Sequence, residues 1–220
     1  MPSSPKILQL RELLAARGLG TVARAPEGFH TGWAALDAAA GEGLPKGDIA
    51  ELNCLHGGGA LAVAECIHAA ERGRYYVALI DGADGFDPAS VETSALTRLL
   101  WVRCHSAAEA VKAADLLLRD GNLPLVLLNL RGCADAARVP SQAWYRLQRI
   151  VEQSGVALLV LTPRPLIPSA RIRLILHGHF TIDDVERSCA DLVEGVTFEA
   201  LRGSSARRLV DDAPQLAEVG

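Results

Sequence analysis

A short glycine cluster lies between a strand-like segment (43–52) and an alanine-rich helical segment (60–72), which is the layout of a phosphate-binding loop. A Walker A loop, G-x-x-x-x-G-K-[ST], uses its lysine on the β- and γ-phosphates and its hydroxyl on Mg²⁺. Here Cys54 replaces the first glycine, Gly59 keeps the second, Ala60 replaces the lysine and Leu61 replaces the hydroxyl residue. The loop therefore predicts that ATP chemistry has been lost.

The glycine cluster itself, Gly57 to Gly59, is open to two interpretations. Backbone N–H groups at a helix N-terminus can bind an anion. The favoured interpretation is a relic turn that lets the strand and the helix pack closely, because no side chain in the cluster supplies positive charge. No cofactor is predicted.

Two kinds of residue could hold a metal ion, and neither makes a convincing site. His56 and His68 belong to different elements, while His177 and His179 share a strand face without a visible third ligand. Asp81, Asp84 and Asp87 follow a strand and could bind Mg²⁺, but a capped loop with Asp87 at the next helix start is favoured. We predict no metal site.

Composition limits the class of protein. The 220 residues carry a net charge of −4 and are half apolar, which fits one domain and gives no basic field for nucleic acid. The five cysteines are odd in number and scattered, as expected for reduced thiols in the cytoplasm: Cys54, Cys66, Cys104, Cys133 and Cys189. No signal peptide or membrane-spanning run is visible, so no membrane association is expected.

The elements around these residues alternate between strand and helix. Buried-strand patterns cover 75–81, 123–130 and 156–162, and a short strand covers 101–104. Helical patterns cover 87–100, 106–119 and 141–154. A short helix is also expected within 31–37. Such alternation predicts an α/β fold with a mainly parallel sheet flanked by helices.

The pattern changes near the C-terminus. Alternating apolar residues at 172–176 and strand candidates at 180–183 and 196–201, with no convincing helix between them, predict an antiparallel C-terminal extension. The expected organisation is an N-terminal helix (1–18), a core with the degenerate loop (19–202) and a flexible tail (203–220).

The N-terminal segment is the best candidate for a partner-binding surface. Ile7, Leu10 and Leu14 share one face of a helix that begins after Ser4 and ends at Gly18. This face could equally fold back onto the chain's own sheet. Several arginines make the C-terminal third locally basic, and a solvated face is the favoured interpretation for them: Arg171, Arg173, Arg202, Arg207 and Arg208.

The stretch from Thr31 to Pro88 resembles the ATPase core of the bacterial RecA recombinase. The resemblance lies in Thr31-Gly32 with Leu36-Asp37, in Gly43-Leu44-Pro45-Lys46-Gly47, and in the segment 80–88 that would carry the catalytic glutamate. It implies a RecA-like core over most of the chain.

The departures from RecA all remove ATP chemistry. The catalytic glutamate falls on Ala83, the Walker B aspartate on Asn129, and the γ-phosphate sensor near Thr162-Pro163. Phosphoryl transfer depends on positioning and charge stabilisation, so losing these groups together makes hydrolysis implausible. The two loops that carry DNA in RecA are also short here, with few bases for phosphates: Arg131, Arg138 and Arg164.

A RecA-like core without ATP residues is similar to two bacterial SOS-response families. The stronger resemblance is to ImuA, which implies a non-catalytic accessory role in SOS mutagenesis, with RecA and ImuB as partners, self-association open, and weak or absent DNA binding. The second is to SulA, the division inhibitor that binds FtsZ. A nucleotide-dependent recombinase paralogue is the alternative from another class, and Ala60, Ala83 and Asn129 argue against it.

Overall fold

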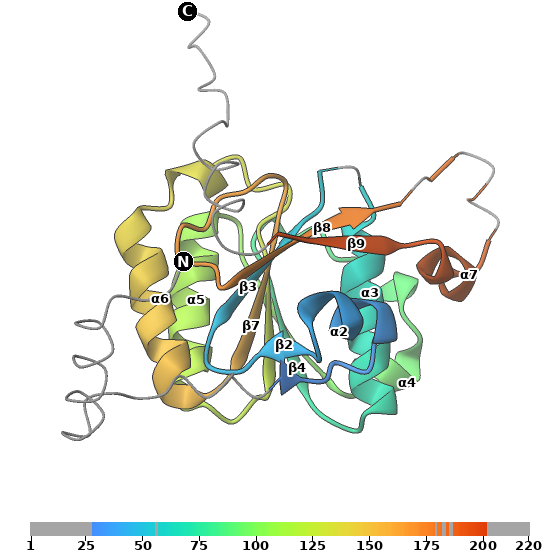
Figure 1. Ribbon diagram of the computed structural model, residues 1–220, viewed down its shortest axis with the longest axis horizontal. Coiled ribbons are helices and arrows are strands. Elements are labelled where there is room, and N and C mark those ends of the chain that lie inside the picture. Colours follow the sequence, from blue (N-terminus) through green and yellow to red (C-terminus); the bar gives the residue numbers. More distant parts are fainter. Residues whose placement is uncertain (1–27, 56, 179, 182–183, 185–186, 202–220) are drawn as a thin grey trace, which may run out of the picture.

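A seven-stranded sheet forms the centre of the computed structural model, which describes residues 28–55, 57–178, 180, 181, 184 and 187–201 (Figure 1). Its strand order is β5-β4-β6-β7-β3-β8-β9. The bounds in that order are Leu99–Arg103, Val77–Asp81, Leu125–Asn129, Ala157–Thr162, Ile49–Asn53, Ile172–His177 and Thr197–Leu201. Every neighbouring pair is parallel except β8 and β9. The predicted α/β class with a mainly parallel sheet is confirmed.

Helices cover both faces of this sheet (Figure 1). On one face lie α2 (Ala34–Ala40), α3 (Gly59–Arg72) and α4 (Thr93–Leu96), and on the other lie α5 (Ala107–Asp120) and α6 (Ser141–Ser154). Alternate strand residues feed the two apolar cores, so that Leu127 packs in the first and Leu128 in the second. None of the described helices combines the length and apolar character needed to cross a bilayer.

The sequence signals at the ends of α5 and α6 predicted these helices closely. Ser106 caps α5, where its Oγ accepts a hydrogen bond from the Glu109 N–H at 3.2 Å. Gly121 and Gly155 end α5 and α6 in the left-handed conformation, with φ of 69° and 71°. These two helices therefore start and stop where local capping chemistry dictates.

Two parts of the predicted pattern were wrong. The helix expected over 87–100 is a 3₁₀ turn, η1 (Pro88–Ser90), followed by the single turn of α4, because Val91 is extended between them and the chain enters β5 at Leu99. Asp87 does cap η1, through a 2.9 Å bond from the Ala89 N–H.

The C-terminal extension also differs from the prediction. β8 pairs in parallel with β3, so only β9 is antiparallel, and a short helix, α7 (Cys189–Glu194), precedes β9. Phe180 and Thr181 are not in a strand. A small antiparallel pair that the sequence did not suggest, β1 (Gly28–Phe29) with β2 (Leu44–Pro45), lies beside α2.

Both terminal segments lie outside the described residues. The predicted N-terminal helix with Ile7, Leu10 and Leu14 falls within 1–27, and the predicted tail falls within 202–220. The domain boundaries proposed from the sequence stay predictions.

Candidate functional site

The glycine turn joins β3 to α3 at the carboxyl edge of the sheet, where open α/β sheets bind their ligands. The Cys54 N–H donates to the carbonyl of Thr162 at 2.9 Å, and the Gly57 N–H donates back to the Cys54 carbonyl at 3.2 Å. Gly58 is the N-cap of α3 with φ of 72° and has no side chain to cap the helix. The first N–H groups of α3 thus face the turn without a side-chain acceptor.

Close packing explains why the turn is built from glycine. A Cβ atom added at Gly58 would lie 2.6 Å from Leu176 Cδ2 and 3.0 Å from Phe180 Cε2. At Gly59 an added Cβ would collide with the guanidinium of Arg131. The glycines let β8, Phe180 and Arg131 approach the helix start, as the relic-turn interpretation requires.

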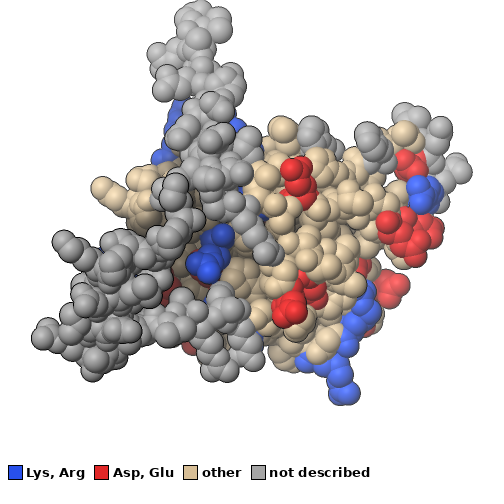
Figure 2. All heavy atoms as spheres, viewed as in Figure 1, with Lys and Arg blue, Asp and Glu red and all other residues tan. Residues whose placement is uncertain are grey.

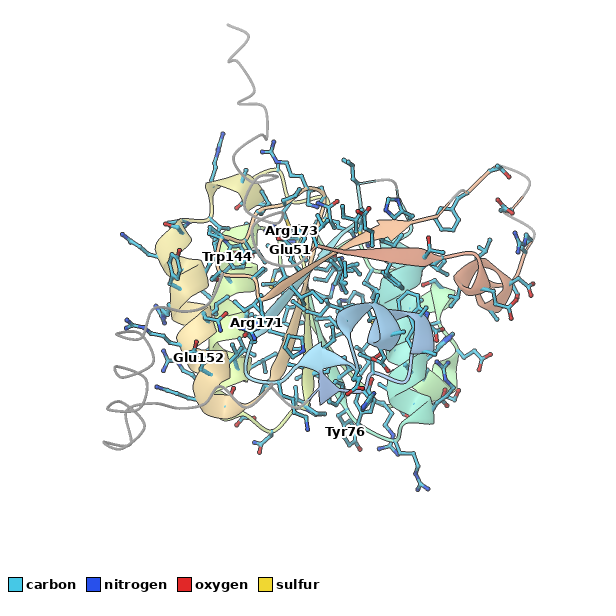
Figure 3. All side chains as sticks on the ribbon, in the orientation of Figure 1. Glu51, Tyr76, Trp144, Glu152, Arg171 and Arg173 are labelled. Atoms are coloured by element: carbon cyan, nitrogen blue, oxygen red, sulfur yellow. The ribbon has the colours of Figure 1, made fainter. Side chains whose placement is uncertain are left out.

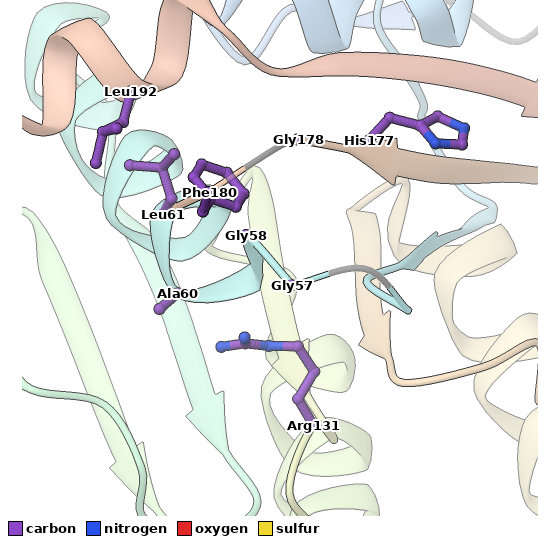
Figure 4. A pocket seen from close by; sticks show the side chains of 9 residues that line it. All are labelled: Gly57, Gly58, Ala60, Leu61, Arg131, His177, Gly178, Phe180 and Leu192. Atoms are coloured by element: carbon purple, nitrogen blue, oxygen red, sulfur yellow. The ribbon is translucent and has the colours of Figure 1, made fainter. Parts of the chain in front are cut away.

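Arg131 was missed as a site residue at this turn. It follows β6, and its side chain lies against Gly59 beside Ala60 (Figure 4). Burial lowers the pKa of its guanidinium, while Cys54 and Asp81 act in the opposite direction. We had expected no positive charge at the turn, and that expectation was wrong. The available signal was the position of Arg131 two residues beyond a strand that ends at the same sheet edge.

Asp81 and Asn129 lie next to each other at the ends of β4 and β6 and are both buried. The Asn129 side-chain amide donates to Asp81 Oδ1 at 3.2 Å, and the Phe86 N–H donates to Asp81 Oδ2 at 2.7 Å. Asn129 Oδ1 accepts from Arg131 Nε at 3.1 Å. We call Asp81, Asn129 and Arg131 the edge cluster. Its polar groups bind each other instead of standing open for a metal ion.

The rest of the acidic run has structural contacts of its own. Asp84 forms an ion pair with Arg103, whose Nε lies 2.6 Å from Asp84 Oδ1, and the hydrogen bond from Arg103 lowers the Asp84 pKa. Ala83, at the predicted position of the catalytic base, is exposed. Within the described ranges, no three His, Cys, Asp or Glu side chains are placed to hold a metal ion.

A hollow of about 770 Å³ opens at this edge (Figure 4). The glycine turn and the first turn of α3 form one side, and Arg131, the end of β8 and α7 form the others. Leu61, Phe180 and Leu192 make one part of it apolar. Burial raises the pKa of Cys54 to about 11, so this neighbouring thiol stays neutral at neutral pH.

These residues do not fit Mg²⁺-ATP. Ala60 and Leu61 cannot contact phosphates or Mg²⁺ through a polar side chain, and Ala83 cannot activate water. Thr162, near the predicted γ-phosphate sensor, is buried and donates its hydroxyl to Glu51 Oε1 at 3.0 Å. The strand–turn–helix layout of a phosphate-binding loop is present, while the polar side chains of the site bind one another.

A second polar cluster consists of Glu51, Arg173 and Thr162, which lie on β3, β8 and β7. We call it the buried cluster, and Figure 3 labels Glu51 and Arg173. Arg173 Nε donates to Glu51 Oε2 at 2.7 Å, and both side chains are almost fully buried. Arg173 therefore does not belong to a solvated basic face, which corrects the prediction. Arg171 is exposed, and Arg202, Arg207 and Arg208 lie outside the described residues.

The buried cluster also fixes the connection between β7 and β8, one of the two shortened loops. Glu51 Oε1 accepts the Leu166 N–H at 2.6 Å, and Arg173 Nη2 donates to the carbonyl of Ile167 at 3.1 Å. Ile167 is fully buried. These hydrogen bonds hold the connection against the sheet. Arg164, which lies in this connection, is half-buried.

The surface around the site shows no continuous basic field in the visible part of Figure 2, where Lys and Arg form separate groups. Acidic side chains gather at the α7 end, where Asp191 and Glu194 are exposed. Among the predicted histidines, His177 Nε2 lies 3.3 Å from Glu199 Oε2, and His68 Nε2 lies 3.5 Å from the Glu92 N–H nitrogen. His56 and His179 lie outside the described residues.

Comparisons with known proteins support the fold. No protein-family model matches the chain, and no curated protein matches it. Among solved structures, a crystal structure of the RadB recombinase matches with a TM-score of 0.54 and 16% sequence identity, covering 69% of this chain and 84% of that chain. At this identity the likeness concerns the fold alone. The RecA-like core expected from the sequence is confirmed at that level.

Proposed function

We propose that this chain is a RecA-like accessory protein that has lost ATP chemistry and acts by binding other proteins. The observation that carries the proposal is the edge cluster. Where the recombinase resemblance places a Walker B acid, Asn129 binds Asp81 and Arg131. Because these polar groups form hydrogen bonds with one another, they support a structural role for the position of the degenerate loop.

The biological process proposed is the bacterial SOS response, in which the chain binds RecA, ImuB or both and supports error-prone translesion synthesis in the cytoplasm. The support is the resemblance of the degenerate loop to ImuA together with the RecA-like fold. A recombinase-shaped surface does not depend on the lost phosphates. Shape and apolar patches therefore remain available to engage a true recombinase.

The N-terminal segment is the proposed contact, with Ile7, Leu10 and Leu14 as apolar anchors. Each leucine buried in a groove contributes roughly 1.5–3 kcal/mol to binding. Changing Leu10→Asp and Leu14→Asp together should therefore weaken binding to RecA by more than about tenfold. A matched control, Gln9→Asp with Ala16→Asp, adds the same charge to the opposite face of the predicted helix and should leave binding unchanged.

The test uses the full chain on a biosensor surface with purified RecA, ImuB and FtsZ in turn. Binding to RecA or ImuB that the leucine pair weakens and the control pair does not would support the proposal. If the leucine variant loses its folded far-ultraviolet spectrum, the segment packs internally and this contact is wrong. Capture of FtsZ alone would instead favour a SulA-like division inhibitor.

One observation favours a second candidate, a paralogue that still binds a nucleotide or another anion. Arg131 places a guanidinium beside the uncapped first turn of α3, where backbone N–H groups attract negative charge. Phosphate binding that Arg131→Gln abolishes would support this candidate.

A further inference from the structure

A groove lies between α5 and α6, in the helical layer opposite α3. It contains two hollows, of about 290 Å³ and about 520 Å³, and Arg146 lines both. The smaller hollow is bounded by both helices, and the larger one extends along α6 toward Gln153. The two hollows therefore form one surface centred on Arg146.

The smaller hollow is largely apolar although it faces solvent. Leu116 leaves 69% of its surface exposed there, and Val111, Ala143 and Leu147 line the same hollow. On α6, Tyr145 is 54% exposed and lines the larger hollow. An exposed leucine and an exposed tyrosine in adjoining hollows, with charged groups around them, are typical of a protein-binding surface.

Arginines surround these apolar groups. Arg119, Arg146 and Arg149 line the larger hollow, and its lining contains no acidic residue. Asp115 is the acid between the helices, and both of its oxygens are engaged by Arg119 and Arg146 at 2.8–3.3 Å. Its charge is thereby neutralised, and the groove presents a net positive charge to a ligand.

The shared carboxylate also holds the two arginines in place. Each guanidinium gives two of its five N–H groups to Asp115, which leaves three to donate outward. Their side chains remain 55% and 64% exposed. Ordering arginines before a ligand arrives lowers the entropy cost of binding it.

We propose that the α5–α6 groove is a docking surface for an acidic amphipathic segment of a partner protein, with an apolar side chain on Leu116 and carboxylates on Arg146 and Arg149. Guanidinium groups bind carboxylates through paired hydrogen bonds, and the apolar floor accommodates an aliphatic side chain. This surface is built from other residues than the proposed N-terminal contact and goes beyond it, whatever the identity of the recombinase partner.

The apolar floor favours a peptide over nucleic acid as the occupant. A phosphate backbone would use the arginines and leave the exposed Leu116 without an apolar partner. A second copy of this chain could offer its acidic α7 end. That arrangement is one outcome of the test below.

The test uses the full chain and a fluorescein-labelled peptide in which leucines recur at helical spacing among glutamates. Fluorescence anisotropy should show saturable binding. Arg149→Glu and Leu116→Ala should each lower the affinity by about tenfold, because one removes the charge partner and the other the apolar contact. Arg74→Glu, the same charge change on an exposed residue of the α3–β4 connection, should leave the affinity within about twofold. Leu116 and Arg149 are exposed, and thermal unfolding of each variant checks that the fold is kept.

Several results would overturn the proposal. The peptide could fail to bind, or Arg74→Glu could weaken binding as much as Arg149→Glu, which would mean unspecific charge attraction. If a peptide with alanines in place of its leucines bound equally well, the proposed apolar contact with Leu116 would be excluded. Single-stranded DNA that displaces the peptide and depends on Arg149 would make the groove a nucleic-acid surface. Sedimentation showing self-association that Arg149→Glu abolishes would make it an interface between copies.

Discussion

The buried cluster and the edge cluster each consist of one acid, one arginine and one neutral hydrogen-bonding residue, yet their surroundings differ. Glu51 and Arg173 lie within the sheet with exposed side-chain fractions of 0% and 3%, and they fix the β7–β8 connection. Arg131 lines an open hollow of about 770 Å³, and it connects the buried Asn129 and Asp81 to this hollow through hydrogen bonds. We therefore expect changes in the buried cluster to cost more stability than changes in the edge cluster, which reaches the hollow where a ligand would bind.

The largest expected effect comes from breaking the buried cluster. Glu51→Leu strands the Arg173 guanidinium, which cannot lose its proton, and should lower the free energy of unfolding by about 3–5 kcal/mol. Arg173→Met should cost less, because the remaining carboxylate can take up a proton. Urea unfolding of both variants measures the difference. Equal losses, or a loss below about 1 kcal/mol for Glu51→Leu, would show that the cluster is not structural.

The pH dependence of Arg173→Met sharpens this prediction. Burial already raises the pKa of Glu51, and Arg173 opposes that rise, so removing Arg173 raises the pKa further. When a carboxyl group has a higher pKa in the folded state than in the unfolded state, the folded protein loses stability as the pH rises from the unfolded pKa through the folded pKa. The deficit of Arg173→Met relative to the unmodified chain should therefore be smaller at about pH 5 than at about pH 8. A deficit that grows on acidification would contradict this account.

The next effect tests the glycine turn at the edge. Gly58→Ala forces a φ of 72° on alanine and places its Cβ against Leu176 and Phe180, so it should cost about 1–3 kcal/mol. Gly85→Ala is the control, because no atom lies within 4 Å of a Cβ added there. Thermal unfolding compares the two. A neutral Gly58→Ala would show that the turn does not serve close packing.

The smallest effect is expected within the edge cluster itself. Asn129→Asp replaces the amide that donates to Asp81 with a second carboxylate, and Arg131 offsets only part of the repulsion. The free energy of unfolding should fall by about 1–2 kcal/mol at neutral pH. Like charge raises the folded pKa of the carboxyl pair, so the loss should shrink near about pH 4. If Asn129→Asp were as stable as the original chain at neutral pH, the edge cluster would be able to hold two carboxylates without a measurable cost from repulsion.

Local chemistry explains how much of the fold the sequence could predict. Ser106, Gly121 and Gly155 mark the ends of α5 and α6 through short-range hydrogen bonds and backbone conformation, so those ends were predictable. The segment 87–100 contains helix-compatible residues, but Val91 is extended and the chain must reach β5, where Trp101 packs on Phe86. Alternation at 172–176 predicted a strand and could not give its direction, which depends on pairing with β3.

The sequence could predict which ATP-binding and catalytic side chains are missing from the candidate site. Ala60 and Leu61 follow from the spacing of the Walker A motif, and Ala83 and Asn129 follow from the resemblance to RecA. The roles of Arg131 and Arg173 required the structure, because Arg131 follows β6 and reaches the start of α3, while Arg173 is buried against Glu51. Charge counts along a sequence do not distinguish a buried arginine from an exposed one.

The most direct test of the central claim is calorimetric titration of the full chain with ATP and Mg²⁺. We predict no binding tighter than the millimolar range, which corresponds to about −4 kcal/mol, and no ATP hydrolysis. Ala60→Lys should not restore activity, because Leu61 and Ala83 remain. Micromolar, magnesium-dependent binding of ATP by the unmodified chain would contradict the account and favour a working nucleotide site.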